Sequence, residues 1–208
     1  MSWQLWLAFF AASWAISLSP GPGAIAVMSA SLRNGFARGY FATFGLVLGL
    51  WTQLVVVAVG VGAILSTSAV AFAIVKWLGV AYLVYLGIRQ WRAAPLSLPS
   101  PGAEPTPATR RRIVAEAWLL NAVNPKGTAF MLAVVPQFLA PAEPLVPQYL
   151  AIAATLSLTD LVVNAGYAAL ASRLLALLRT PARAHAVQRV FGSLFIALGV
   201  LLATFKRA

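Results

Sequence analysis

Long apolar stretches separated by short polar connections dominate this sequence. Six of them reach the length of about 20 residues that a helix needs to cross the hydrocarbon core of a bilayer. They cover residues 4–30, 39–63, 68–89, 114–138, 146–171 and 187–205. Hydrophobic residues make up 61% of the chain and charged residues 9%, which leaves too few polar side chains to cover a water-exposed surface. The sequence therefore predicts an all-α integral membrane protein with six transmembrane helices and lipid as its solvent.

The distribution of basic residues predicts how these helices are oriented. Eleven arginines lie in the first, third and fifth connections, whereas the opposite side carries only Lys206 and Arg207 of the tail. The positive-inside rule places the eleven in the cytoplasm and both termini outside it. Topology also accounts for the net charge of +11, so we expect no nucleic-acid partner. A five-span arrangement with one re-entrant segment would move one terminus and stays open.

Several kinds of chemistry lack the residues that they need. The chain has no cysteine and a single histidine, His185, which excludes thiol catalysis, cysteine metal sites and histidine-rich metal sites. Neither an HExxH motif nor a Walker loop occurs. Only Asp160 clearly lies within an apolar stretch, so an intramembrane aspartyl pair is missing as well. We expect no metal, no cofactor and no enzyme. A channel or a metal-ion exporter on the same scaffold is the alternative to an organic-solute exporter.

Helix-breaking residues interrupt two of the apolar stretches. Residues 17–29 read SLSPGPGAIAVMS, and residues 121–130 read NAVNPKGTAF. Each proline removes a backbone donor and clashes with the preceding turn. Inside lipid such a break survives only where protein or a water-filled cavity satisfies the freed backbone groups. Those groups can bind a polar solute, and the amino-terminal amides of half-helices starting near Pro22 and Pro125 would suit a carboxylate. The predicted substrate pathway comprises Ser19, Pro20, Gly21, Pro22, Gly23, Asn124, Pro125 and Lys126.

The two breaks lie at matching positions of two similar halves. Pro20 and Pro125 are 105 positions apart, and WLGVAYLVYLG around Gly79 loosely resembles VFGSLFIALG around Gly192. An odd number of spans per half would insert the second half upside down, which is typical of secondary transporters with a site at the midplane. Chance resemblance between apolar segments is the alternative. We therefore predict one transporter domain over residues 1–208, with repeat 1 over 1–92, a cytoplasmic proline-rich linker over 93–113 and repeat 2 over 114–208.

A polar stripe marks the fifth apolar stretch. Asp160, Asn164 and Tyr167 are spaced to share one helix face, which should point into the bundle. A charge in lipid is costly, so Asp160 is a candidate for proton coupling or for binding a substrate ammonium. A structural hydrogen-bonded stripe is the alternative. Lys126 has three candidate roles: an ion pair with Asp160, a contact with a substrate carboxylate, or a hydrogen bond that supports the broken backbone.

The motif GLVLG, with Gly45 and Gly49, has the small-xxx-small spacing that lets two helices approach closely. We favour packing within the chain, and a homodimer through this motif is the alternative.

Three segments together resemble a known family. SPGPGAIAVMSASLRNGFARGYFATFGLVLG, NPKGTAFMLAVVPQF and KWLGVAYLVYLGIRQWR are similar to the signatures of the lysine exporter (LysE/RhtB) family, which includes homoserine and threonine exporters. The resemblance implies a multi-pass exporter of amino acids or their derivatives in the bacterial cytoplasmic (inner) membrane, driven by the proton gradient through alternating access. It also implies an amino-acid substrate, lipid surroundings and protons as partners. Gly23 departs from the asparagine that the family often has after SPGP, which bears on substrate identity.

Overall fold

The computed structural model describes residues 3–65, 69–92, 108–140 and 142–204, and all regular structure in these ranges is helical, which confirms the all-α part of the prediction. The first part contains α1 (Trp3–Leu18), α2 (Pro22–Asn34), α3 (Phe36–Gly39), α4 (Phe41–Leu65) and α5 (Ala69–Arg92). The second part contains α6 (Arg110–Ala122), α7 (Pro125–Val134), the 3-10 turn η1 (Val135–Phe138), α8 (Leu145–Ala169), α9 (Ala171–Arg179) and α10 (Pro181–Thr204).

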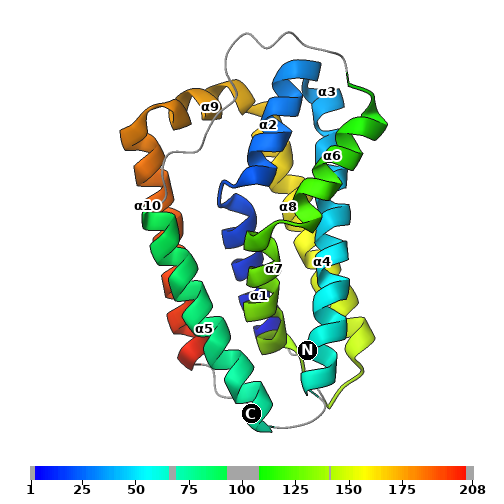
Figure 1. Cartoon of the computed structure of the whole chain (residues 1–208), viewed down its shortest axis with the longest axis vertical. Helices are drawn as coiled ribbons and strands as arrows, with labels where there is room; N and C mark the ends of the chain where they lie inside the picture. The colour runs from blue at the N-terminus through cyan, green and yellow to red at the C-terminus, as the bar shows by residue number, and fades with distance from the viewer. Residues whose placement is uncertain (1–2, 66–68, 93–107, 141, 205–208) are drawn as a thin grey trace.

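The helices form an elongated bundle with most axes along its length (Figure 1). In the view of Figure 1, α1 and α2 run upward, α4 runs downward and α5 upward again. The second part runs the opposite way: α6 and α7 descend, α8 ascends and α10 descends, while α9 crosses the upper end. As a result α1 begins and α10 ends at the same, lower end of the bundle.

Not every predicted span can be recognised in the described residues. Two helical stretches, Phe36–Gly60 and Leu145–Ala169, are long and apolar enough to cross a membrane by themselves. The pair α1 and α2 passes the same test as one bent span, with an angle of 55° at its break. The helices are thus suited to lipid, and the number of six spans stays a prediction.

Both predicted breaks occur where the prolines place them. Helix α2 begins at Pro22 after an extended Gly21, and α7 begins at Pro125 with Asn124 as its N-cap. Proline is well tolerated at the first helical position because its missing N–H would have no intrahelical partner there. The prolines therefore end one helix and start the next.

Glycines allow α4 to lie directly against α6. A Cβ atom at Gly45 would clash with the carbonyl oxygen of Val114, and one at Gly49 would lie 2.7 Å from the Cβ of Asn121. The motif GLVLG is therefore used for packing within the chain, as its spacing favours.

Two predicted boundaries are wrong. Helix α6 begins at Arg110, where Thr109 caps it, so the last residues of the predicted linker are helical. The sixth helix begins at Pro181 and not at residue 187, again because proline suits a first helical position. The connection RLLALLRTPARAHAVQR is therefore mostly helix, and His185 lies in α10. Residues 93–107 of the linker and the basic tail, Lys206 and Arg207, lie outside the described residues.

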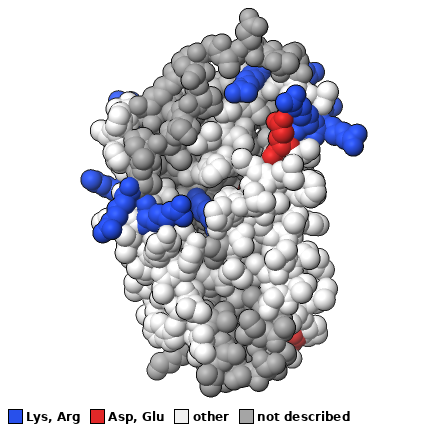
Figure 2. All heavy atoms as spheres, viewed as in Figure 1, with Lys and Arg blue, Asp and Glu red and all other residues white. Residues whose placement is uncertain are grey.

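Basic side chains gather toward one end of the molecule. On the face shown in Figure 2 they lie between the upper part and the middle of the molecule, where α2 and α5 end and α6 begins in Figure 1. The lowest third of this face shows no basic side chain among the described residues.

Candidate functional site

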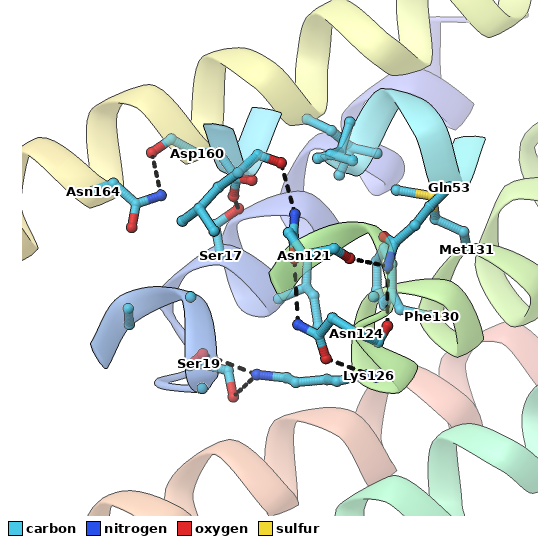
Figure 3. A pocket seen from close by; sticks show the side chains of 18 residues that line it. Ser17, Ser19, Gln53, Asn121, Asn124, Lys126, Phe130, Met131, Asp160 and Asn164 are labelled. Carbon is cyan, nitrogen blue, oxygen red and sulfur yellow. Dashed lines mark hydrogen bonds between the residues drawn. The ribbon is translucent and has the colours of Figure 1, made fainter. Parts of the chain in front are cut away.

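The two breaks enclose a small polar cavity. Its volume is about 100 Å³. Because one buried water needs only about 10–15 Å³ on such a measure, the cavity has room for several waters or one small solute. Helices α1, α2, α4, α6, α7 and α8 all contribute to its wall (Figure 3). The polar side chains in the lining belong to Ser17, Ser19, Gln53, Asn121, Asn124, Lys126, Asp160 and Asn164.

Lys126 joins the two breaks. Its ammonium donates hydrogen bonds to the carbonyl oxygen of Ser19 at 2.9 Å and to the Ser19 hydroxyl at 2.8 Å. The Ser19 carbonyl stands just past the end of α1, where backbone acceptors lose their helical partners. The lysine of the second break thus supports the backbone of the first break, one of the roles that the sequence left open. Its Nζ also lies 5.6 Å from the ring centre of Phe195 on α10, within reach of a cation–π contact.

Asp160 is held from the opposite direction. The Ser17 hydroxyl donates a hydrogen bond of 2.6 Å to the carboxylate, and Thr159 lies 3.2 Å from the same hydroxyl. Figure 3 shows Asp160 with Ser17 on one side of the cavity and Lys126 with Ser19 on another. The structure records no ion pair between Lys126 and Asp160, so of the three candidate roles of Lys126 this conformation shows the hydrogen bond to the broken backbone. Each charged side chain is instead hydrogen-bonded to a serine, and each lines the shared cavity.

Amides organise the second break. The Asn124 side chain accepts a hydrogen bond from the backbone N–H of Lys126 at 3.1 Å, which caps α7. Gln53 on α4 donates to the carbonyl oxygens of Asn121 and Asn124, at 2.6 and 3.0 Å. The Asn121 side chain donates to the carbonyl of Leu46, also on α4, at 2.7 Å. Interrupted backbone is thereby satisfied by protein, as a lipid environment requires.

The rest of the predicted pathway divides into lining and supporting residues. Gly21, Gly23 and Asn164 line the cavity, whereas Tyr167 does not. The Tyr167 hydroxyl donates to the carbonyl of Leu18 at 2.7 Å and so supports the end of α1. The prolines of the two breaks also lie outside the lining and act by shaping the backbone. These are Pro20, Pro22 and Pro125.

Gly23 leaves little room for a side chain. A Cβ atom there would lie 3.2 Å from a methyl group of Leu46. An asparagine at this position, which the family often has, would require Leu46 to shift. With glycine the cavity is wider and has one polar side chain fewer.

Sequence reasoning missed Ser17, Gln53 and Asn121. Gln53 carried a usable signal, because it is the single amide side chain in an otherwise apolar stretch over 39–63. Asn121 lies one turn before the second break, where unsatisfied carbonyls are expected. Ser17 carried no signal of its own, since a serine in a membrane helix commonly bonds its own backbone.

A small cavity with one cation and one anion, formed where two lipid-suited helices are interrupted, is typical of a secondary transporter. Comparison with known proteins identifies the particular group. The LysE type translocator family matches residues 14–205, and the chain belongs to this family. It is therefore a transport protein of the bacterial inner membrane and not an enzyme, as predicted.

Named relatives cover all or part of the chain. The homoserine/homoserine lactone efflux protein of Salmonella typhi is 40% identical over 208 residues, the full length of both chains. An uncharacterized membrane protein of Vibrio cholerae is 38% identical over 207 residues, 99% of this chain and all of the relative. The leucine efflux protein of Enterobacter sp. is 31% identical over 127 residues, 60% of this chain and 58% of the relative. No solved structure matches.

Proposed function

We propose that the protein exports a small amino acid or amino-acid derivative across the inner membrane, coupled to proton entry. Its family consists of translocators, and two groups of its relatives are named as efflux proteins, for homoserine or its lactone and for leucine. Both names refer to small molecules that carry an ammonium group. A solute of this class matches the size of the cavity between the breaks.

The observation that carries the proposal is the placement of opposite charges around one cavity. Lys126 and Asp160 both line it, and each is held by a serine and not by the other. A zwitterion placed between them would offer its carboxylate to Lys126 and the backbone amides at the breaks, and its ammonium to Asp160. Charge-assisted hydrogen bonds of this kind are about twice as strong as neutral ones.

Proton coupling follows from competition between a proton and the substrate ammonium for the Asp160 carboxylate. The carboxylate binds an ammonium only while it is ionised. A proton entering from outside would neutralise Asp160 and release the solute to the outside. Loss of that proton to the cytoplasm would restore the carboxylate and its ability to bind the next solute. The charge exchange links export of one solute to entry of a proton.

We also propose six spans in two inverted halves that rock against each other. The opposite directions of the two parts and the common end of α1 and α10 support this arrangement. So does the contact between α5 and α10: a Cβ at Gly87 would lie 2.6 Å from the carbonyl oxygen of Gly192, and the reverse distance is also 2.6 Å. These glycines are 105 positions apart, the separation of Pro20 and Pro125. Equivalent residues meet reciprocally when a two-fold axis passes between them.

The test is uptake into inside-out vesicles, whose outer face is the cytoplasmic one. Labelled homoserine, threonine, leucine and lysine are supplied with an acidic vesicle interior, to wild type and to Asp160→Asn. We expect gradient-driven uptake of at least one neutral amino acid by the wild type. In Asp160→Asn we expect it to fall about a hundredfold, because the amide can neither pair fully with an ammonium nor exchange a proton.

Glu143→Gln is the matched control. This acid is exposed and lines neither the cavity between the breaks nor the larger cavity near the start of α6, so its loss should leave uptake unchanged. Unchanged uptake in Asp160→Asn would make Asp160 structural. Absence of uptake of every amino acid by the wild type would contradict amino-acid export and favour another solute, a metal ion or a channel.

A further inference from the structure

A second, larger cavity lies between α2, α4 and α6, on the side of the arginine-bearing end. Its volume is about 400 Å³. Alanines from the three helices and the segment before α6 leave much of this space open. Those in the lining are Ala26, Ala30, Ala42, Ala108 and Ala117.

The second cavity lies nearer the arginine-bearing end of the same helices. Ala24 of α2 lines the first cavity and Ser29 lines the second, and these two residues are about 7.5 Å apart along the helix axis. Between the two cavities lies a buried apolar contact of Val27, Leu46 and Ala117. A solute on its way from the arginine-bearing end to the breaks would meet the second cavity first.

The polar groups of this cavity suit a carboxylate. Arg33, in the last turn of α2, has no ion-pair partner among the described residues. Arg112 is already bound to Glu116, at 2.7 Å. The Ser29 hydroxyl oxygen is buried and lacks a hydrogen-bond partner within the described part of the chain. A guanidinium presents a planar pair of donors that matches a carboxylate, and a nearby hydroxyl adds a third donor.

We infer that the second cavity is a cytoplasm-side docking site in which Arg33 binds the carboxylate of the solute before it reaches the site between the breaks. The inference rests on the proposed function, since it names the entry step of the same transport path. Glu116 lines the same cavity and carries the opposite charge, so its carboxylate would face the ammonium of the solute.

Passage onward requires Val27 to separate from Leu46, and α2 is the element able to move. It begins at the break at Gly21, and Gly39 of α3 lies directly against the backbone of Ser31, so α2 and α3 would move together. Helices α4 and α6, in contrast, are locked together at Gly45 and Gly49.

The test compares two solutes that differ only in the carboxylate. Uptake into inside-out vesicles is measured for the amino acid that the wild type transports and for its uncharged amide. We expect Arg33→Gln to raise KM for the amino acid about tenfold with kcat unchanged, the size of one charge-assisted hydrogen bond. KM for the amide should stay the same. Arg33→Lys keeps the charge but loses the planar pair of donors, so it should give an intermediate KM for the amino acid.

Two controls separate docking from other effects. Arg38→Gln removes an exposed arginine of α3 that lines neither cavity, and it should change neither KM. Ala26 lines the second cavity, so in Ala26→Cys the solute should slow labelling by a thiol reagent added to the cytoplasmic face. The native chain has no cysteine and therefore gives no background labelling.

The outcomes distinguish this inference from the proposed function. A wild type that transports no amino acid would overturn export itself. A transporting wild type with an unchanged KM in Arg33→Gln, or with equal increases for acid and amide, would overturn only the docking site. Labelling of Ala26→Cys that responds to anionic lipid and not to solute would overturn it too and assign the cavity to a lipid headgroup.

Discussion

Single polar side chains hold the breaks of this protein together. Three of them bond backbone carbonyls near an interruption of the helices, namely Lys126, Tyr167 and Gln53, and Asn121 beside the second break bonds the Leu46 carbonyl within α4. Backbone groups in a membrane-spanning bundle must be satisfied by protein or by water in a cavity, so these side chains contribute to stability as well as to the cavity between the breaks.

Gln53→Leu tests how much such a side chain contributes to stability at the second break. The change removes hydrogen bonds to the carbonyls of Asn121 and Asn124, yet each carbonyl keeps a backbone donor, from Asn124 and Thr128 respectively. We therefore expect a loss of about 1 kcal/mol of unfolding free energy, the low end of the range for a removed partner. Reversible denaturation in detergent micelles measures it.

Gln137→Leu is the matched control at the residue scale. The Gln137 amide nitrogen is buried without a hydrogen-bond partner in the described structure. Replacing it with an apolar side chain of similar size should be neutral or stabilising, because no bond is lost. Equal destabilisation by both changes would show that the bonds of Gln53 contribute nothing specific.

At the scale of elements, close helix pairs depend on missing Cβ atoms. Gly87 on α5 faces the carbonyl of Gly192 on α10, and its Cβ position lies 2.5 Å from Ile196. We expect Gly87→Ala to separate the two helices and to cost about 1–3 kcal/mol, as overpacking does. The melting temperature of the purified protein in detergent should fall.

Gly60→Ala provides the comparison for Gly87→Ala. Among the described parts of the chain, no atom lies within 4 Å of a Cβ at Gly60, in the interior of α4. Alanine there should raise the melting temperature, because it stabilises a helix by about 0.5–1 kcal/mol relative to glycine. An increase in both variants would contradict the close contact between α5 and α10.

At the scale of the whole molecule, the opposite ends of the bundle should face opposite sides of the membrane. Helix α3, which contains Arg38, and the junction of α9 and α10, which contains Thr180, lie at the upper end in Figure 1. The start of α8, three residues after Ala142, lies at the lower end. All three are exposed. We expect an impermeant maleimide to label Ala142→Cys in intact cells, and Arg38→Cys and Thr180→Cys only in inside-out vesicles. The cysteine-free chain is the background. Labelling of Ala142→Cys and Thr180→Cys from the same side would exclude α8 as a span.

The sequence by itself determined the helices, their breaks and the face of α8 that carries Asp160 and Asn164. These features depend on hydropathy, proline and helical period, which act over a few neighbouring residues. Helices α6 and α10 begin four and six residues before the predicted apolar stretches, because a cap or a proline extends the helix into a polar connection.

Only the tertiary structure decided which groups meet at the cavity. That Lys126 bonds Ser19 and not Asp160, and that Ser17 holds the carboxylate, depends on contacts between residues more than 100 positions apart. Lipid requires every freed backbone group to be satisfied, and the local sequence shows where such groups arise. Which side chain satisfies them depends on how the helices pack, a property of the whole bundle.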